Sequence, residues 1–204
     1  MQDTMRTDTD SASKVGFSLR VAVLLAAVLV LGATDTSATT RQQKPQPTIK
    51  AGDLARQVHA RVNEQRKKHR LQPLAWSDAL SRIAVMHSRD MADRDYLDHN
   101  TPEGKTFSDR YRQSGFSCEI LVGNKIHAGA ENLALSRLYN ATTRENGITY
   151  YHWNSPEEIA LRTVDGWMDS PSHRENILTP HWRQEGVGIE IGPGNKIYIT
   201  ENFC

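Results

Sequence analysis

Apolar residues from residue 53 onward recur at the spacing of α-helices in several separate segments. Leu54, Val58 and Val62 lie four residues apart, so they form one stripe of a helix. This helix is predicted to begin with Asp53 as its N-cap and to end near Arg70, after a run of basic residues that suits a helix C-terminus. Its stripe is expected to face the protein core.

Two further helices are predicted from the same spacing. One begins at Ser77–Asp78, and its apolar face includes His87, which is expected to be a packed core histidine. The next begins at Thr106–Ser108 and stops at Gly115, since glycine favours the position just after a helix. Both helices therefore belong to the folded domain.

A strong helix start and a tight corner follow residue 154. Ser155–Glu158 places serine at the N-cap, proline at the first helical position and glutamate at the third, which is typical of a capping box. Ser170–Pro171 then ends this helix and starts a short one that buries Ile177. His173 is thereby held on a rigid corner, where its ring could bind a metal, move a proton or hydrogen-bond local backbone.

The C-terminal residues show alternation instead of helical spacing. Gly186–Ile191 and Lys196–Phe203 flank the turn-forming segment Gly192–Asn195, which predicts a β-hairpin. Residues 136–154 fit neither pattern, and no element is assigned to them. Helices followed by a terminal hairpin indicate an α+β fold with a mostly antiparallel sheet.

Composition and charge narrow the class of protein. The chain has 204 residues, of which 38% are hydrophobic, with 25 basic and 24 acidic side chains. This length allows one core with appendages, and the composition is that of a soluble globular protein. The near-neutral balance provides no basic surface for nucleic acid, so nucleic acid is not an expected partner.

The N-terminus predicts export. Lys14 and Arg20 precede the apolar run Val21–Ala33, which suits a secretory signal better than a membrane span. Cleavage after Thr36–Ala38 makes residues 1–38 a signal peptide, and an uncleaved anchor is the alternative. Residues 39–50, with two prolines, predict a flexible linker before a domain of residues 51–204. The mature protein is expected to be secreted, with no membrane span.

Cys118 and Cys204 are the two cysteines of the chain. Export places them in an oxidising compartment, and they lack the close histidine partners of a zinc site. We therefore expect a Cys118–Cys204 disulfide that ties the C-terminus to the middle of the domain.

Three segments together resemble the CAP superfamily, which comprises the cysteine-rich secretory proteins, antigen 5 and pathogenesis-related 1. They are Tyr96–His99, Ala130–Ala134 and Trp167–Leu178. Their order and spacing carry the resemblance, which covers about residues 54–204. The form of the third segment is similar to the prokaryotic branch. The resemblance implies an α-β-α sandwich, with an antiparallel sheet between helical layers.

The resemblance also implies a cavity lined by two histidines and two glutamates, which binds zinc in some members. His99, Glu131 and His173 match three of these positions. The second glutamate is expected three residues after Trp167, where this chain has Ser170. Two neutral imidazoles and a carboxylate are a known zinc ligand set, so His99 and His173 are predicted as metal ligands. Alternatively, Glu131 orients a histidine without metal.

The favoured function is a secreted domain whose cavity binds a small ligand, lipid, peptide or divalent metal without turnover. The sequence contains neither the H-E-x-x-H nor the G-x-S-x-G motif of hydrolases. A metal-dependent hydrolase or peptidase is one alternative. The other is an interaction protein that uses its linker to reach a cell-envelope component.

Overall fold

The structure is a computed structural model that describes residues 44–204. The predicted signal peptide and the first part of the predicted linker lie outside these residues. The helices are α1 (Ala51–Lys68), α2 (Asp78–Arg94), α3 (Phe107–Gln113), α4 (Pro156–Asp169), α5 (Pro171–Leu178) and the short 3-10 helix η1 (Pro193–Asn195). The strands are β1 (Ala75–Trp76), β2 (Ile120–Val122), β3 (Lys125–His127), β4 (Ala130–Arg137), β5 (Tyr139–Glu145), β6 (Ile148–Trp153), β7 (Gln184–Gly192) and β8 (Lys196–Phe203).

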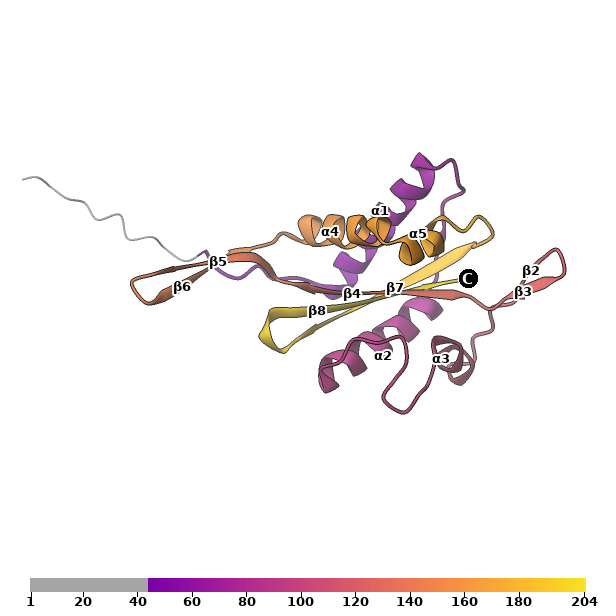
Figure 1. Cartoon of the computed structure of the whole chain (residues 1–204), viewed down its shortest axis with the longest axis horizontal. Helices are drawn as coiled ribbons and strands as arrows, with labels where there is room; N and C mark the ends of the chain where they lie inside the picture. The colour runs from indigo at the N-terminus through magenta and orange to yellow at the C-terminus, as the bar shows by residue number, and fades with distance from the viewer. Residues whose placement is uncertain (1–43) are drawn as a thin grey trace, which may run out of the picture. The chain divides into compact units, whose positions relative to one another are not determined.

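The central sheet has four strands in the order β1-β7-β8-β4. β8 is antiparallel to both of its neighbours, and only the two-residue β1 runs parallel to β7. Figure 1 shows α1, α4 and α5 on one side of this sheet and α2 and α3 on the other. The predicted α+β class and α-β-α sandwich are confirmed.

Local signals position most helix ends as expected. Ser77 accepts a hydrogen bond from the backbone of Leu80, and Ser155 forms a capping box with Glu158. The predicted start of α1 was wrong. Lys50 is the N-cap of α1, and Asp53 lies in its first turn. The helix begins earlier because Ile49 packs against the core and fixes the preceding chain, while the Asp53 charge still suits the helix N-terminus.

The packing of α2 on β7 depends on two glycines of the strand. A Cβ atom at Gly186 would lie 2.1 Å from the backbone nitrogen of Ser81, and one at Gly188 would lie 2.0 Å from that of Val85. The close approach lets Ser88 reach across, where its hydroxyl donates to the Gly188 carbonyl at 3.0 Å. These contacts fix α2 against the sheet.

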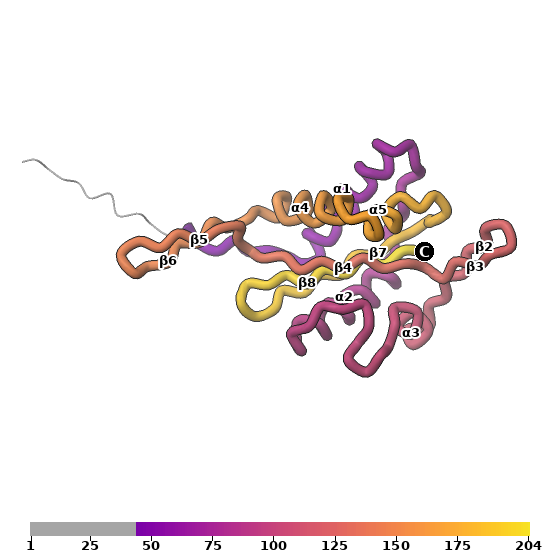
Figure 2. The backbone as a smooth tube through the Cα atoms, in the orientation of Figure 1, coloured from indigo at the N-terminus to yellow at the C-terminus, as the bar shows by residue number. Residues whose placement is uncertain are grey.

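Two hairpins extend from opposite ends of the central sheet (Figure 2). The β5–β6 hairpin occupies the segment to which the sequence pattern assigned no element. Its aromatic side chains form a cluster, in which the Tyr151 and Trp153 rings stack at 4.9 Å and Tyr139 packs edge-on. The Trp153 indole also donates a hydrogen bond to the Lys44 carbonyl at 3.0 Å.

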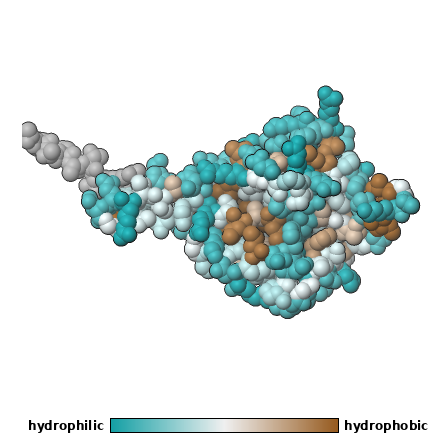
Figure 3. Space-filling view, viewed as in Figure 1, coloured by the Kyte–Doolittle hydropathy of each residue, from teal (hydrophilic) through white to brown (hydrophobic). Residues whose placement is uncertain are grey.

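The β2–β3 hairpin has an apolar surface. Leu121, Val122 and Ile126 are exposed on it, and Figure 3 shows apolar surface there. Just before this hairpin, Cys118 forms the predicted disulfide with Cys204. Both cysteines are buried in a cluster with apolar residues of α2 and α3. Within residues 44–204, no helix is both long enough and apolar enough to span a bilayer.

Candidate functional site

Glu131 is the centre of the candidate site. It lies at the start of β4, and its side chain is 1% exposed. One carboxylate oxygen, Oε1, lies 3.0 Å from Nδ1 of His99, and the other, Oε2, lies 2.5 Å from Nη2 of Arg110. Arg110 also donates to the His99 carbonyl at 2.9 Å. Both oxygens of the buried carboxylate are therefore engaged by the loop after α2 and by α3.

These contacts determine the protonation of His99. Its hydrogen bond to Glu131 raises the pKa of His99, and partial burial opposes this effect. The protonated ring is thus stabilised by the carboxylate, as expected for a charge-assisted hydrogen bond. His99 is about half exposed, so the interaction is partly screened by solvent.

His173 is held beside this group through its backbone. The Asn132 amide donates to the His173 carbonyl at 3.2 Å. Asn176 donates to the side-chain oxygen of Asn132 at 2.9 Å and to the Glu131 carbonyl at 3.2 Å. Burial lowers the pKa of His173, and the charge of nearby His99 lowers it further. The neutral imidazole of His173 is therefore favoured, and the residue lies on a fixed corner.

A cavity of about 400 Å³ lies along β4, α4 and the His173 corner. Its lining is mostly apolar, and Leu97 and Leu135 are 46% and 45% exposed at its edge. Figure 3 shows this apolar surface at the β4 edge of the sheet, between the two helical layers. The polar groups of the lining are Ser136, Arg162, Thr163, Ser170 and His173.

Two of the three residues predicted for the site contact each other, and the third lines the cavity. His99 and Glu131 bind each other, and His173 lines the cavity. Within residues 44–204, no hydrogen bond or ion pair joins the His173 side chain to Glu131, and no group of three His, Cys, Asp or Glu residues could hold a metal ion. The predicted zinc ligands His99 and His173 therefore stay a prediction, with no group of three such ligands around them in the described part of the chain.

The family pattern expects a second glutamate where this chain has Ser170, and Ser170 does line the cavity. A serine hydroxyl gives this position a neutral donor and acceptor in place of a charge. Among the residues that line the cavity, Arg162 therefore carries the charge, and His173 adds a titratable ring.

Sequence reasoning missed Arg110, Asn132 and Asn176. Arg110 lies three residues after Phe107, so the two side chains share one face of α3, and both are at least partly buried. A charged residue at such an inward position requires a buried partner, which is Glu131. The two asparagines gave no periodic signal, because their roles depend on contacts between β4 and α5.

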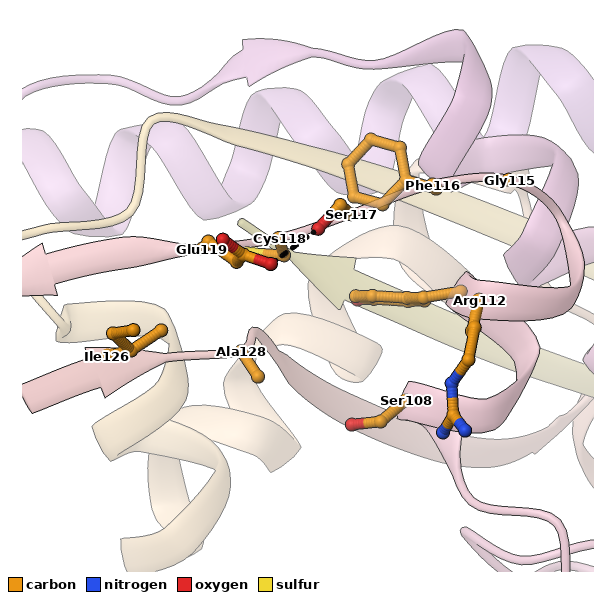
Figure 4. A pocket seen from close by; sticks show the side chains of 10 residues that line it. Ser108, Arg112, Gly115, Phe116, Ser117, Cys118, Glu119, Ile126 and Ala128 are labelled. Atoms are coloured by element: carbon orange, nitrogen blue, oxygen red, sulfur yellow. Dashed lines mark hydrogen bonds between the residues drawn. The ribbon is translucent and has the colours of Figure 1, made fainter.

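A second cavity, of about 580 Å³, lies between α3 and the β2–β3 hairpin. Phe116, Cys118 and Ile126 contribute apolar surface to it, and the Ser117 hydroxyl donates to the Glu119 carboxylate at 3.2 Å near its rim (Figure 4). None of the three predicted site residues lies among the residues that line it. It is therefore separate from the candidate site.

The chain matches a known protein family. The model of the cysteine-rich secretory protein family, CAP, matches residues 59–203. The match spans most of the chain and includes both histidines and the glutamate of the candidate site. The protein therefore belongs to the CAP family, as its sequence motifs predicted.

Two relatives come from Bacillus subtilis. The uncharacterised protein YkwD is 31% identical over 132 residues, which cover 64% of this chain and 40% of the relative. The uncharacterised membrane protein YlbC is 26% identical over 148 residues, which cover 72% of this chain and 33% of the relative. The chain thus matches less than half the length of either relative.

Solved structures show the same fold. An extracellular protein with an SCP domain from Bacillus anthracis has a TM-score of 0.53 and 24% identity, over 75% of this chain and 40% of that one. An outer surface protein from Borrelia burgdorferi has a TM-score of 0.54 and 18% identity, over 78% of this chain and 97% of that one. At these identities the likeness concerns the fold.

Proposed function

We propose that this protein is an extracellular CAP-domain protein whose cavity binds a small amphipathic molecule without turnover. The observation that carries the proposal is the cavity of about 400 Å³ beside His173. Its volume lies within the range of small-molecule sites, and its mix of apolar walls with a few polar groups is typical of them.

The arrangement of the lining favours an amphipathic ligand. Leu97, Leu133 and Leu135 offer apolar contact along one part of the cavity. Arg162 and His173 offer a cation and a neutral imidazole that suit a carboxylate or another polar head. A fatty acid combines the two features, and a lipid or an apolar peptide end with a free carboxylate would share them.

Binding without turnover is favoured over hydrolysis. A hydrolase needs an activated nucleophile or a metal-bound water. In the candidate site, Glu131 is buried and paired with His99 and Arg110, which favours a structural role over that of a general base. Within residues 44–204, no hydrogen bond joins Ser170 to His173, so a serine activated by this histidine is not supported either.

Location outside the cytoplasm is supported by three observations. The sequence has a short apolar run after two basic residues near its N-terminus. It also has a disulfide, which is typical of oxidising compartments. The similar solved structures are described as extracellular and outer-surface proteins.

The chain offers a matched pair of variants for testing the cavity. Gly166 lines the cavity, and a Cβ atom there would meet no atom within 4 Å. Gly52, in the first turn of α1, is equally open and lies far along the chain from the cavity residues. Gly166→Phe would therefore fill the cavity without backbone strain, and Gly52→Phe would place the same side chain elsewhere.

The assay is the fluorescence of a dansylated fatty acid titrated with purified protein. We expect Gly166→Phe to weaken binding by roughly tenfold or more, which corresponds to about 1.4 kcal/mol, and Gly52→Phe to leave it unchanged. Equal affinity in all three proteins would exclude the cavity as the binding site. Release of products from ester or peptide substrates by the wild-type protein would favour the hydrolase.

A further inference from the structure

Two glutamates meet in the core beneath the His173 corner. Glu185 on β7 and Glu201 on β8 are both fully buried. Glu201 pairs with Val187 across the two strands, so Glu185 and Glu201 are diagonal neighbours on the same face of the sheet. Buried carboxyl groups require partners, because each unpaired charge would carry a large desolvation cost. The partners of this pair therefore show where its protons lie.

His59 on α1 provides the first partner. The Asn63 side chain is fixed by two hydrogen bonds with the Leu74 backbone, so its amide nitrogen, Nδ2, is identified as the group 3.3 Å from Nε2 of His59. Nε2 then accepts a hydrogen bond and carries no proton. The Nδ1–H group must donate to Oε1 of Glu185, at 2.5 Å. Burial lowers the pKa of His59, which agrees with a neutral ring instead of an ion pair.

The remaining contact shows which glutamate keeps a proton. Oε2 of Glu185 and Oε1 of Glu201 are buried and have no hydrogen-bond partner among residues 44–204. Two neighbouring buried carboxylates would repel each other, whereas one proton shared between them satisfies both of these oxygens, so a proton lies between the two side chains. Glu185 is the acceptor of the His59 N–H and faces the charge of Arg66 on α1, so its ionised form is stabilised. Glu201 is the donor.

The electrostatics agree with this assignment. Burial and the negative charge of Glu185 raise the pKa of Glu201 well above its usual range. Burial also raises the pKa of Glu185, to about 7, while the hydrogen bond from Glu201 and the charge of Arg66 counteract that rise. The groups that face the pair are His59 and Arg66 from α1 and the neutral Asn132 from β4.

Glu201 is directly linked to the candidate site. Its second oxygen, Oε2, accepts a hydrogen bond from the Asn132 amide at 3.0 Å. The other hydrogen of that amide goes to the His173 carbonyl, at 3.2 Å. Asn132 in turn accepts from Asn176 of the same corner. The neutral carboxylic acid of Glu201 is thus hydrogen-bonded to Asn132, and Asn132 is hydrogen-bonded to His173 and Asn176 of α5.

We propose that Glu201, kept as a neutral carboxylic acid, is a positioning residue for the His173 corner, and that loss of its proton shifts this corner. The proposal rests on the proposed binding function of the cavity. When the proton passes to water, the charge of the pair changes from −1 to −2. Two adjacent buried carboxylates repel each other, so Glu201 moves relative to Glu185. The ionised Glu201 also accepts more strongly from the Asn132 amide, so the position of Asn132, and with it the His173 corner, changes.

Conservative variants separate this role from simple core packing. Glu201→Gln keeps an N–H donor toward Glu185 and a carbonyl acceptor for Asn132, but it has no proton to lose. Glu201→Leu fills similar space and removes both contacts. Glu190→Gln, at a partly exposed site on β7 that pairs with Arg89, is the control for loss of a glutamate charge.

The experiment follows ¹³C-labelled glutamate carboxyl signals and the backbone amides of His173 and Asn176 in the full chain by NMR across pH 4 to 9. We expect one carboxyl signal to stay protonated near neutral pH, where exposed glutamates, with pKa values of about 4.3, are ionised. It should be missing in Glu201→Gln and present in Glu190→Gln. The amides of His173 and Asn176 should show the titrations of His99 and His173 in both proteins, and a further titration step in the wild type that is missing in Glu201→Gln.

Folding equilibria give a second readout. A folded-state pKa above the unfolded value means that the folded chain holds a proton that the unfolded chain has lost. The contribution of this carboxyl group to the free energy of unfolding is then fully present below about pH 4.3 and is lost as pH rises toward the folded-state pKa. In this range the folding equilibrium constant falls by up to about tenfold per pH unit. Glu201→Gln should lack this one-proton contribution, and Glu190→Gln should retain it. Identical pH profiles for wild type and Glu201→Gln would overturn the proposal.

Probe binding completes the test. We expect Glu201→Gln to bind the dansylated fatty acid at pH 7 within about twofold of wild type, and Glu201→Leu to bind it roughly tenfold more weakly. Equal binding by Glu201→Leu and wild type would contradict the positioning role. Absence of binding by the wild-type protein would contradict the proposed function instead, and the NMR and folding readouts do not depend on it.

Discussion

The disulfide between Cys118 and Cys204 is predicted to provide much of the stability of the domain. The two residues are separated by 86 positions. For a loop of this length, the chain-entropy model gives about 4.6 kcal/mol at 25 °C. Native domains have free energies of unfolding of about 5–15 kcal/mol, so the loss would be a large fraction of the total. For a domain of this size it corresponds to a fall in Tm of roughly 9–18 °C.

Two measurements distinguish the stability contributed by the disulfide cross-link from that contributed by local packing of the sulfurs. Reduction of the wild-type protein removes the bond and no heavy atoms. The double variant Cys118→Ala, Cys204→Ala also removes two buried sulfurs that pack among apolar residues of α2 and α3. Free energies of unfolding are measured in guanidinium chloride with and without reductant, and the double variant should not respond to reductant. A difference below about 1 kcal/mol between oxidised and reduced wild type would refute the loop-entropy reasoning.

Three further predictions concern packing, the site and export. Gly188→Ala should lower the free energy of unfolding by about 1–3 kcal/mol or more, because its Cβ would lie 2.0 Å from the Val85 nitrogen. The control variant Gly52→Ala should not be destabilising. Equal effects of the two substitutions would contradict the close packing of α2 on β7. In histidine NMR spectra, the pKa of His99 should lie above 6.5, and Glu131→Gln should lower it. The contribution of His99 to stability should be present at low pH and lost as pH rises through the raised pKa. An unchanged pKa in Glu131→Gln would refute the pairing of His99 with Glu131. N-terminal sequencing of exported protein should give a start between about residues 34 and 40, and full-length chain retained in the membrane would contradict export.

The parts of the fold that depend on local signals could be predicted from the sequence. The apolar stripe of α1 and the capping residues Ser77 and Ser155 act within one or two helical turns, so their pattern is visible along the chain. The β5–β6 hairpin could not be predicted in this way. It is stabilised by an aromatic cluster around Trp153 and by contact with Lys44, which is distant in sequence.

The candidate site shows the same division. Family motifs identified His99, Glu131 and His173, and the structure brings the first two into contact. Spacing places Arg110 on the same helix face as Phe107, but it could not identify Glu131 as its partner, because that contact joins α3 to a strand 21 positions away. Glu201 gave no signal either, since its role depends on a neighbouring strand and on α1.

One measurement shows directly whether a fatty acid binds in the cavity beside His173 or on the apolar surface of the β2–β3 hairpin. Nuclear Overhauser effects are recorded between the protons of a bound fatty acid and ¹³C-labelled methyl groups of the protein. The account predicts contacts from the acyl chain to the methyls of Leu133 and Leu135, which line the cavity. Contacts to Leu121 and Ile126 on the hairpin, with none to the cavity leucines, would contradict it.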